Sequence, residues 1–180
     1  MTEKVPENKE QWFVLRISYG REMAIKARLE REGHRVFIPM KYVRTEENGK
    51  VSHEWVPAVG NLLFANATHR YLYDFILAEG DRRRTHFMWN RSDQKPIVVP
   101  DKQMEDFIQV CSESNEGVVY LSDPSVKLRN GAKVRVINGP FIGVEGTVVR
   151  IKKSRRIMVE IPGIIAAAST YVPMEDLEII

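Results

Sequence analysis

Cysteine is scarce in this sequence, which has one, Cys111, among its 180 residues. A single thiol cannot form an internal disulfide, so we expect the reducing environment of the cytoplasm. The four histidines, at positions 34, 53, 69 and 86, lie 16 to 19 residues apart, without the short spacing typical of zinc sites. No phosphate-binding loop, dinucleotide fingerprint or nucleophile elbow occurs. We therefore expect no enzyme, no metal site and no cofactor.

Long hydrophobic runs are also missing. The longest, such as residues 163–168, fall far short of the ~20 residues that a membrane-spanning helix needs. The first ten residues are polar and lack the apolar core of a signal peptide. Hydrophobic residues make up 43% and charged residues 28% of the chain, which is ordinary for a globular protein. A chain of this length suits one large domain or two small ones.

Positive charge gathers in the last third of the chain. Residues 126–180 hold nine lysines and arginines against five acidic residues, whereas the remainder is close to neutral. A basic region of this kind suits a partner that contains nucleic acid. The same small excess is also common on solvated surfaces, so charge alone leaves both interpretations open.

A strand, a tight turn and a second strand are predicted within residues 133–151. Val134 and Val136 alternate with Arg135 and Ile137 before the turn, and Val148 and Ile151 recur after it, as in half-buried strands. The turn at residues 138–140 reads Asn-Gly-Pro, which favours chain reversal. Gly and Pro cost about 1 and 3 kcal/mol each inside a helix. We therefore expect a small curled sheet that stays β.

Strands and helices alternate in the first 111 residues. The patterns predict strands at 12–17, 36–43, 51–56, 62–65 and 85–89, an extended segment at 96–100, and helices at 21–32, 70–79 and 101–111. This order suggests an α+β domain with helices packed on a sheet. We expect a disordered lead at 1–10, this domain at 11–111, a linker at 112–124 and a β-rich domain at 125–180.

Residues 135–148, RVINGPFIGVEGTV, resemble the KOW motif of NusG-type transcription elongation factors and of some ribosomal proteins. The first domain resembles the NusG N-terminal domain, since Trp12-Phe13-Val14 is followed by a helix. The resemblance implies an α+β N-terminal domain and a small all-β, SH3-like KOW barrel. Residues 60–64 and 96–104 look more like the specialised antiterminators of capsular and exopolysaccharide operons than like housekeeping NusG.

The resemblance implies a transcription elongation regulator that binds RNA polymerase and promotes antitermination of a specific operon, with polysaccharide biosynthesis as the expected target. In the family, an apolar patch of the N-terminal domain docks on the clamp helices of the polymerase. By position, the patch here would comprise Phe13, Leu62, Phe64 and Phe87. Two alternatives stay open. The first is that these four residues simply form the buried face of the sheet. The second is that the protein is a ribosome-associated RNA-binding KOW protein without a polymerase role.

Further contacts are expected at two other places. In the family, the KOW domain binds Rho or a small-subunit ribosomal protein, through a turn that here carries Phe141 and a loop that here carries Ile164 and Ile165. The second place is the basic cluster Arg82-Arg83-Arg84, which precedes aromatic residues and suits nucleic acid at the transcription bubble. A solvated loop explains that cluster equally simply. We expect a monomer.

Overall fold

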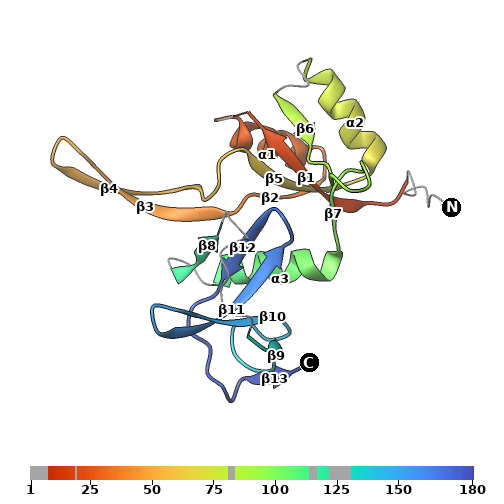
Figure 1. The fold of residues 1–180 in the computed structure, drawn as a ribbon. Helices are drawn as coiled ribbons and strands as arrows, with labels where there is room; N and C mark the ends of the chain where they lie inside the picture. The colour runs from red at the N-terminus through yellow and green to blue at the C-terminus, as the bar shows by residue number, and fades with distance from the viewer. Residues whose placement is uncertain (1–7, 19, 81–83, 114–116, 122–130) are drawn as a thin grey trace. The chain divides into compact units, whose positions relative to one another are not determined.

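The computed structural model describes residues 8–18, 20–80, 84–113, 117–121 and 131–180 (Figure 1). Contacts within the chain divide it into two units. The first unit is Met1–Pro39 with Val59–Asp101, and the second is Met40–Ala58 with Lys102–Ile180. No helix in the described part of the chain is long and apolar enough to cross a membrane.

The first unit is built on an antiparallel sheet. Its strands follow the order β2-β5-β1-β6, and β7 pairs with β1 beyond this path. The bounds are β1 (Gln11–Ile17), β2 (Arg35–Phe37), β5 (Leu62–Ala67), β6 (Thr85–Phe87) and β7 (Val98–Val99). The central strands β1 and β5 are rich in β-forming and small apolar residues, and Trp12 to Leu15 and Leu62 to Ala65 are all buried.

Two helices of the first unit, α1 (Glu22–Arg31) and α2 (His69–Ala78), are tied together by one carboxylate. Glu79, which follows α2, forms ion pairs with Arg21 and Arg28, and its side chain is only 8% exposed. Thr68 caps α2 because its hydroxyl oxygen accepts a hydrogen bond of 3.2 Å from the amide of Tyr71. The helix predictions for this part of the sequence are confirmed.

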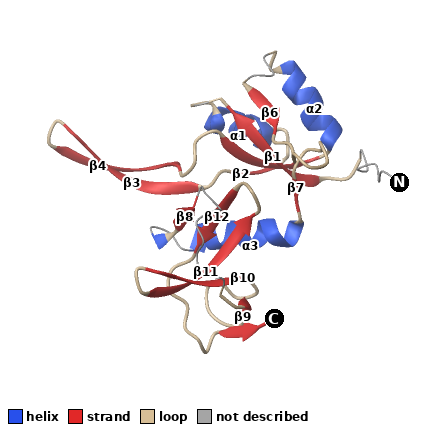
Figure 2. Ribbon diagram, viewed as in Figure 1, coloured by secondary structure: helices blue, strands red, loops and turns tan. Residues whose placement is uncertain are grey.

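The hairpin of β3 (Met40–Glu47) and β4 (Lys50–Pro57) forms a two-stranded sheet of its own, which we call the arm. Figure 2 shows it as a long pair of strands. Its turn at Asn48 and Gly49 has positive φ at both residues, as Asn-Gly hairpins require. The sequence analysis counted these strands with the first domain. The arm's side chains are mostly charged or polar, so it has little apolar surface to bury in a larger sheet.

The second unit contains a six-stranded antiparallel sheet in the order β13-β9-β10-β11-β12-β8. The bounds are β8 (Val119–Leu121), β9 (Lys133–Val136), β10 (Glu145–Ile151), β11 (Ser154–Ile161), β12 (Ile165–Ala168) and β13 (Leu177–Ile179). At Gly146 a Cβ atom would lie 2.6 Å from the carbonyl oxygen of Met158, so this close crossing requires glycine. The predicted fold class, an α+β domain followed by an all-β domain, is confirmed.

Helix α3 (Asp101–Glu113) follows the first unit in sequence, and from Lys102 onward its contacts group it with the second. Its buried face consists of Met104, Phe107, Val110 and Cys111, together with one acid, Asp106. Strand β8 lies within residues 112–124, which the sequence analysis assigns to the linker. Residues 114–116 and 122–124 of that segment, and residues 1–7 of the expected lead, lie outside the described residues.

Candidate functional site

Strand register divides the four residues of the expected polymerase patch between two faces of the sheet. Leu62 and Phe64 pair with even-numbered positions of β1. Phe87 pairs with Leu15, so it shares a face with Phe13. All four side chains are buried, at 4% exposure or less. The structure therefore brings Phe13 and Phe87 together and places the other two on the opposite face.

Phe87 forms the floor of a shallow apolar groove of about 220 Å³ between α2 and β6, which we call the α2–β6 groove. The groove is lined by His69, Tyr73, Ile76, Leu77, His86, Phe87 and Trp89. Three of these side chains are large and exposed: Trp89 at 52%, Tyr73 at 43% and Leu77 at 38%. Exposed aromatic and leucine side chains around a buried ring are typical of a surface that binds another protein.

Stacked rings hold the groove in shape. The Phe87 ring lies 5.1 Å from the ring of His69, at an interplanar angle of 17°. Phe13 supports it from behind, edge-on, at 5.5 Å. Trp89 lies beside the same ring at 6.5 Å, also edge-on. The buried residues of the expected patch thus position the exposed ones, which the sequence analysis did not select.

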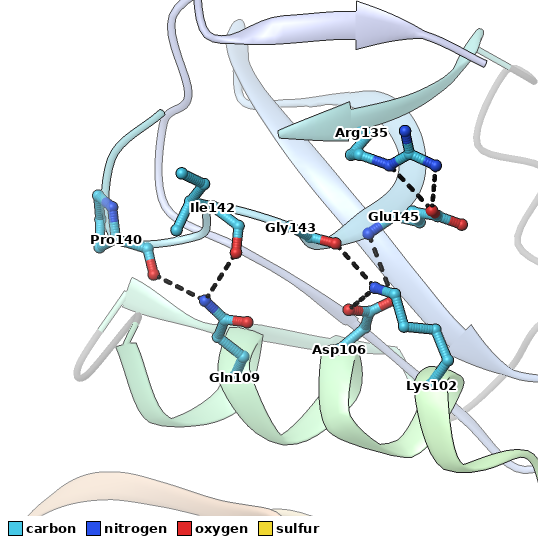
Figure 3. Close-up of polar contacts among 8 residues, drawn as sticks. All are labelled: Lys102, Asp106, Gln109, Arg135, Pro140, Ile142, Gly143 and Glu145. Carbon is cyan, nitrogen blue, oxygen red and sulfur yellow. Dashed lines mark hydrogen bonds and ion pairs between the residues drawn. The ribbon is translucent and has the colours of Figure 1, made fainter. Parts of the chain in front are cut away.

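The turn of the second unit that carries Phe141 is bound by helix α3 (Figure 3). Lys102 donates hydrogen bonds to the carbonyl oxygen of Gly143, at 2.7 Å, and to the carboxylate of Asp106, at 2.5 Å. Asp106 also accepts a bond of 3.3 Å from the amide of Glu145. We call the side chains of Lys102, Asp106 and Gln109 the clasp.

Gln109 completes the clasp one helical turn further along α3. Its side-chain amide donates to the carbonyl oxygen of Pro140 at 3.0 Å and to that of Ile142 at 3.4 Å, as Figure 3 shows. The clasp therefore satisfies three carbonyls and one amide of the turn. The bonds to the three carbonyls are exposed, so the bond to the partly buried amide of Glu145 is the one whose loss should cost most.

The three residues expected to contact a partner of the KOW domain are all buried. Phe141 is 3% exposed, Ile164 is 9% exposed and Ile165 is fully buried. Ile165 lies within β12, where it pairs with Ile161. A partner reaches these side chains only if the elements that cover them move.

Cys111 and Tyr120 form a second buried polar contact in this unit. Burial raises the pKa of the Cys111 thiol to about 12, and the neighbouring Tyr120 hydroxyl offsets part of that rise. The pKa of Tyr120 is raised too, first because the ring is buried and then because of Cys111. The Tyr120 hydroxyl donates a hydrogen bond of 2.8 Å to the carbonyl oxygen of Met40. The thiol is thus a structural group and not a nucleophile at neutral pH.

Of the expected nucleic-acid cluster, Arg82 and Arg83 lie outside the described residues. Arg84 is exposed, and its carbonyl oxygen accepts a hydrogen bond of 2.6 Å from the amide of Ser18. In the described part of the chain, no three acidic, histidine or cysteine side chains gather as metal ligands would.

Tyr73, Leu77 and Trp89 are not among the residues that the sequence predicts for the polymerase patch. A usable signal existed, because Leu77 stands one position after the buried pair Phe75 and Ile76 on α2 and so lies at the edge of the helix's apolar face. Trp89 stands two residues after Phe87, on what the sequence predicts as one strand, but β6 ends at Phe87. Trp89 lies beyond the strand, in an isolated bridge with Pro96, and its side chain is 52% exposed.

Comparison with known proteins assigns this arrangement to a class. The family described as transcription termination factor NusG matches residues 10–108, and the KOW motif matches residues 130–160. No curated protein matches the chain. Among solved structures, one of Thermotoga maritima NusG, concerned with its domain interaction, is 18% identical; the match covers 96% of this chain and 98% of that one, with a TM-score of 0.49.

An α+β unit of the NusG type followed by an all-β KOW domain defines a class of regulatory proteins that act on transcription elongation and interact with RNA polymerase. The NusG match covers more than half of the 180 residues. This chain belongs to the NusG family.

Proposed function

We propose that this protein is a non-enzymatic elongation factor that docks on the clamp helices of RNA polymerase through the α2–β6 groove. The observation that supports this most directly is the group of exposed side chains, Tyr73, Leu77 and Trp89, around the buried Phe87. A helix that packs into an apolar groove is held mainly by a few aromatic and leucine anchors. The groove offers three such anchors on elements fixed by the sheet.

The finer part of the proposal is antitermination of a specific operon, with polysaccharide biosynthesis as the target, in the cytoplasm. It rests on the resemblance of residues 60–64 and 96–104 to specialised antiterminators. The alternative of a ribosome-associated protein without a polymerase role is not favoured, because the match to the NusG family covers the whole α+β part, residues 10–108.

The original four-residue patch remains a prediction beside this proposal. Leu62 and Phe64, on the opposite face of the sheet from Phe87, belong to the same proposal only if that face meets the polymerase as well. The two faces can be separated by mutation, which gives the proposal a sharp test.

The experiment measures binding of full-length protein to core RNA polymerase without nucleic acid. Leu77→Glu and Trp89→Glu should each weaken binding by at least about tenfold, since a loss above roughly 2 kcal/mol is typical of a central anchor. Trp55→Glu is a matched control, because Trp55 on the arm is 49% exposed and Trp89 is 52% exposed. It should leave binding unchanged.

The outcome that contradicts the groove is wild-type affinity in both groove variants. Co-purification with ribosomal RNA, together with no retention of the wild-type protein on polymerase, would instead contradict polymerase docking as a whole.

We also retain the KOW contact with a small-subunit ribosomal protein or Rho as part of the proposal. Because Phe141, Ile164 and Ile165 are buried, such a partner needs the elements that cover them to move, and Phe141 can be reached only if the turn that carries it opens. The clasp on that turn is therefore the element expected to control access.

A further inference from the structure

The arm carries a row of rings on one face. Tyr42 pairs with Trp55 across the two strands, and Arg44 pairs with His53. Paired residues, and residues two apart on one strand, share a face of a sheet. The rings of Tyr42 and His53 are stacked, with centroids 5.4 Å apart and an interplanar angle of 7°. The ring of Trp55 lies 5.2 Å from that of Tyr42. We call this the ring face.

These rings remain open to solvent. Trp55 is 49% exposed and Tyr42 is 38% exposed, and His53 is exposed as well. Ring pairs across two strands help to stabilise an isolated hairpin, which is otherwise marginal in water. That role would be satisfied by any bulky β-forming pair. It does not explain why three flat ring systems with free outer surfaces stand beside an arginine.

The charges of the ring face suit an anionic partner. From the base of the arm outward, its first three pairs are Met40 with Pro57, Tyr42 with Trp55, and Arg44 with His53, which include one cation and no carboxylate. Glu54 lies on the other face, opposite Val43. The first carboxylate on the ring face, that of Glu46, comes in the next pair toward the tip.

A hollow of about 350 Å³ adjoins the base of the ring face. Lys41, Tyr42 and Tyr120 line it together with Met40, Ala58 and two valines. The Tyr120 hydroxyl is already bonded to the carbonyl oxygen of Met40, which fixes this wall. Lys41 pairs with Val56 and so lies on the other face of the arm, which leaves Tyr120 as the ring that the hollow adds to the end of the row.

We propose that the ring face of the arm binds single-stranded nucleic acid. Successive bases stack on Trp55 and on the Tyr42–His53 pair, Arg44 contacts a phosphate, and the hollow beside Tyr120 receives the next nucleotide. Exposed rings with interleaved cations bind unpaired bases in this way because every base offers a flat face. A duplex is excluded as the preferred ligand, since its base faces are already covered. This site is separate from the α2–β6 groove and does not depend on polymerase docking.

The test uses fluorescence anisotropy with labelled oligonucleotides of about twelve nucleotides, oligo-dT and oligo-rU, and a duplex of the same length, against full-length protein without polymerase. Single strands should bind more tightly than the duplex. Tyr42→Ala and Trp55→Ala should each weaken single-strand binding by about fivefold or more, whereas Trp55→Phe should retain most of it. Arg44→Gln should flatten the salt dependence by about 0.7 log units for one lost phosphate contact.

Thr45→Ala controls for the stability of the hairpin. The hydroxyls of Thr45 and Ser52 lie 2.6 Å apart on the other face of the arm, so this variant loosens the hairpin without touching a ring. It should leave oligonucleotide binding unchanged. Equal losses in Thr45→Ala and Trp55→Ala would mean that the rings only hold the hairpin together, and would overturn the proposal.

Three other results would overturn it too. In the first, the ring variants still bind oligonucleotides, whereas a variant with Arg82, Arg83 and Arg84 all changed to Ala does not. Another is equal affinity for the duplex. The third is a Trp55→Ala variant that loses polymerase binding but not oligonucleotide binding, which would make the ring face a protein-docking surface.

Discussion

Two antiparallel strand pairs of similar construction meet opposite environments in this protein. In the pair β1 and β5, the facing stretches Trp12 to Leu15 and Leu62 to Ala65 are buried without a break. In the arm, strands of eight residues each leave most side chains exposed on both faces. The hydrogen-bonded backbone is alike, so the side chains alone decide which pair forms a core and which offers a surface.

The contrast between these two strand pairs shows which side chains can contact a partner. A strand that is buried on both faces contributes to function by fixing the position of its neighbours, as Phe13 does for Phe87 in the α2–β6 groove. A strand that is exposed on both faces presents its own side chains, as Tyr42 and Trp55 do on the ring face.

The largest expected effect is that of Phe64→Glu in the doubly buried pair. Phe64 is fully buried, so the variant places a carboxylate among apolar side chains. We expect the free energy of unfolding to fall by about 4 kcal/mol or more, which unfolds most small domains. Urea denaturation followed by circular dichroism measures this loss.

Trp55→Glu on the arm is the matched change in the exposed pair, and its urea midpoint should stay close to that of the wild type. A folded Phe64→Glu variant that has lost polymerase binding would reverse the comparison. It would assign docking to the face of Leu62 and Phe64 and not to the groove.

The same contrast explains what the sequence could predict. Helices, strands and the two-part fold follow from periodicity and turn residues, because these signals are local. The face on which each residue of the expected polymerase patch lies does not follow, because a continuous apolar run such as Leu62-Leu63-Phe64-Ala65 carries no alternation that would assign a face to each residue. The register that separates Phe64 from Phe87 depends on pairing between distant strands.

The packing of α3 could not be predicted for a related reason. Its apolar face, with Met104 and Phe107, indicates that the helix is buried on one side. It does not indicate which element the helix packs against. The sequence analysis placed α3 in the first domain, and its contacts group it with the second unit. The clasp residues Lys102, Asp106 and Gln109 look like ordinary solvent-facing side chains until the turn is in place.

Helix α3 is intermediate in burial between the β1–β5 pair and the arm, because it has a buried apolar face and a polar clasp beside it. Asp106→Ala removes the acceptor for the amide of Glu145 and the partner of Lys102. We expect α3 to open more often, by a factor of about five, because an orphaned donor that is only partly buried costs about 1 kcal/mol, the low end of the range for unpaired donors. The labelling rate of Cys111, the single thiol, measures this opening, since the thiol is buried on the same helix.

The pH dependence of labelling provides an internal check. The pKa of the folded thiol is raised to about 12 by burial, so near neutral pH it reacts almost only from the opened state. The rate should therefore rise about tenfold per pH unit up to the ordinary thiol pKa of about 8.5. Ser112→Ala, an exposed change on α3, should leave the rate unchanged. An Asp106→Ala variant that labels like the wild type would show that the clasp does not hold the helix.

The smallest expected effect concerns a surface ion pair of the barrel. Arg135 donates two hydrogen bonds to Glu145, at 3.0 and 2.7 Å, and these hold the pKa of that carboxyl below its ordinary value. A carboxyl whose pKa is lower in the folded state adds stability above its unfolded pKa and loses that contribution as pH falls through the folded one. Arg135→Met should therefore lower Tm slightly at pH 7, and the difference from the wild type should shrink toward zero at pH values well below about 4.

Arg150→Met is the control, because Arg150 lies opposite Arg155 in the register and not opposite a carboxylate. The difference in Tm between Arg150→Met and the wild type should not shrink as the pH falls. Thermal unfolding of both variants between neutral and acidic pH, in low and high salt, checks the prediction. A difference for Arg135→Met that persists in acid and in high salt would mean that the stem of Arg135 stabilises the barrel by packing and not by its charge. In that event the outer face of β9 would be stabilised by packing, as its inner face, with the buried Val134 and Val136, already is.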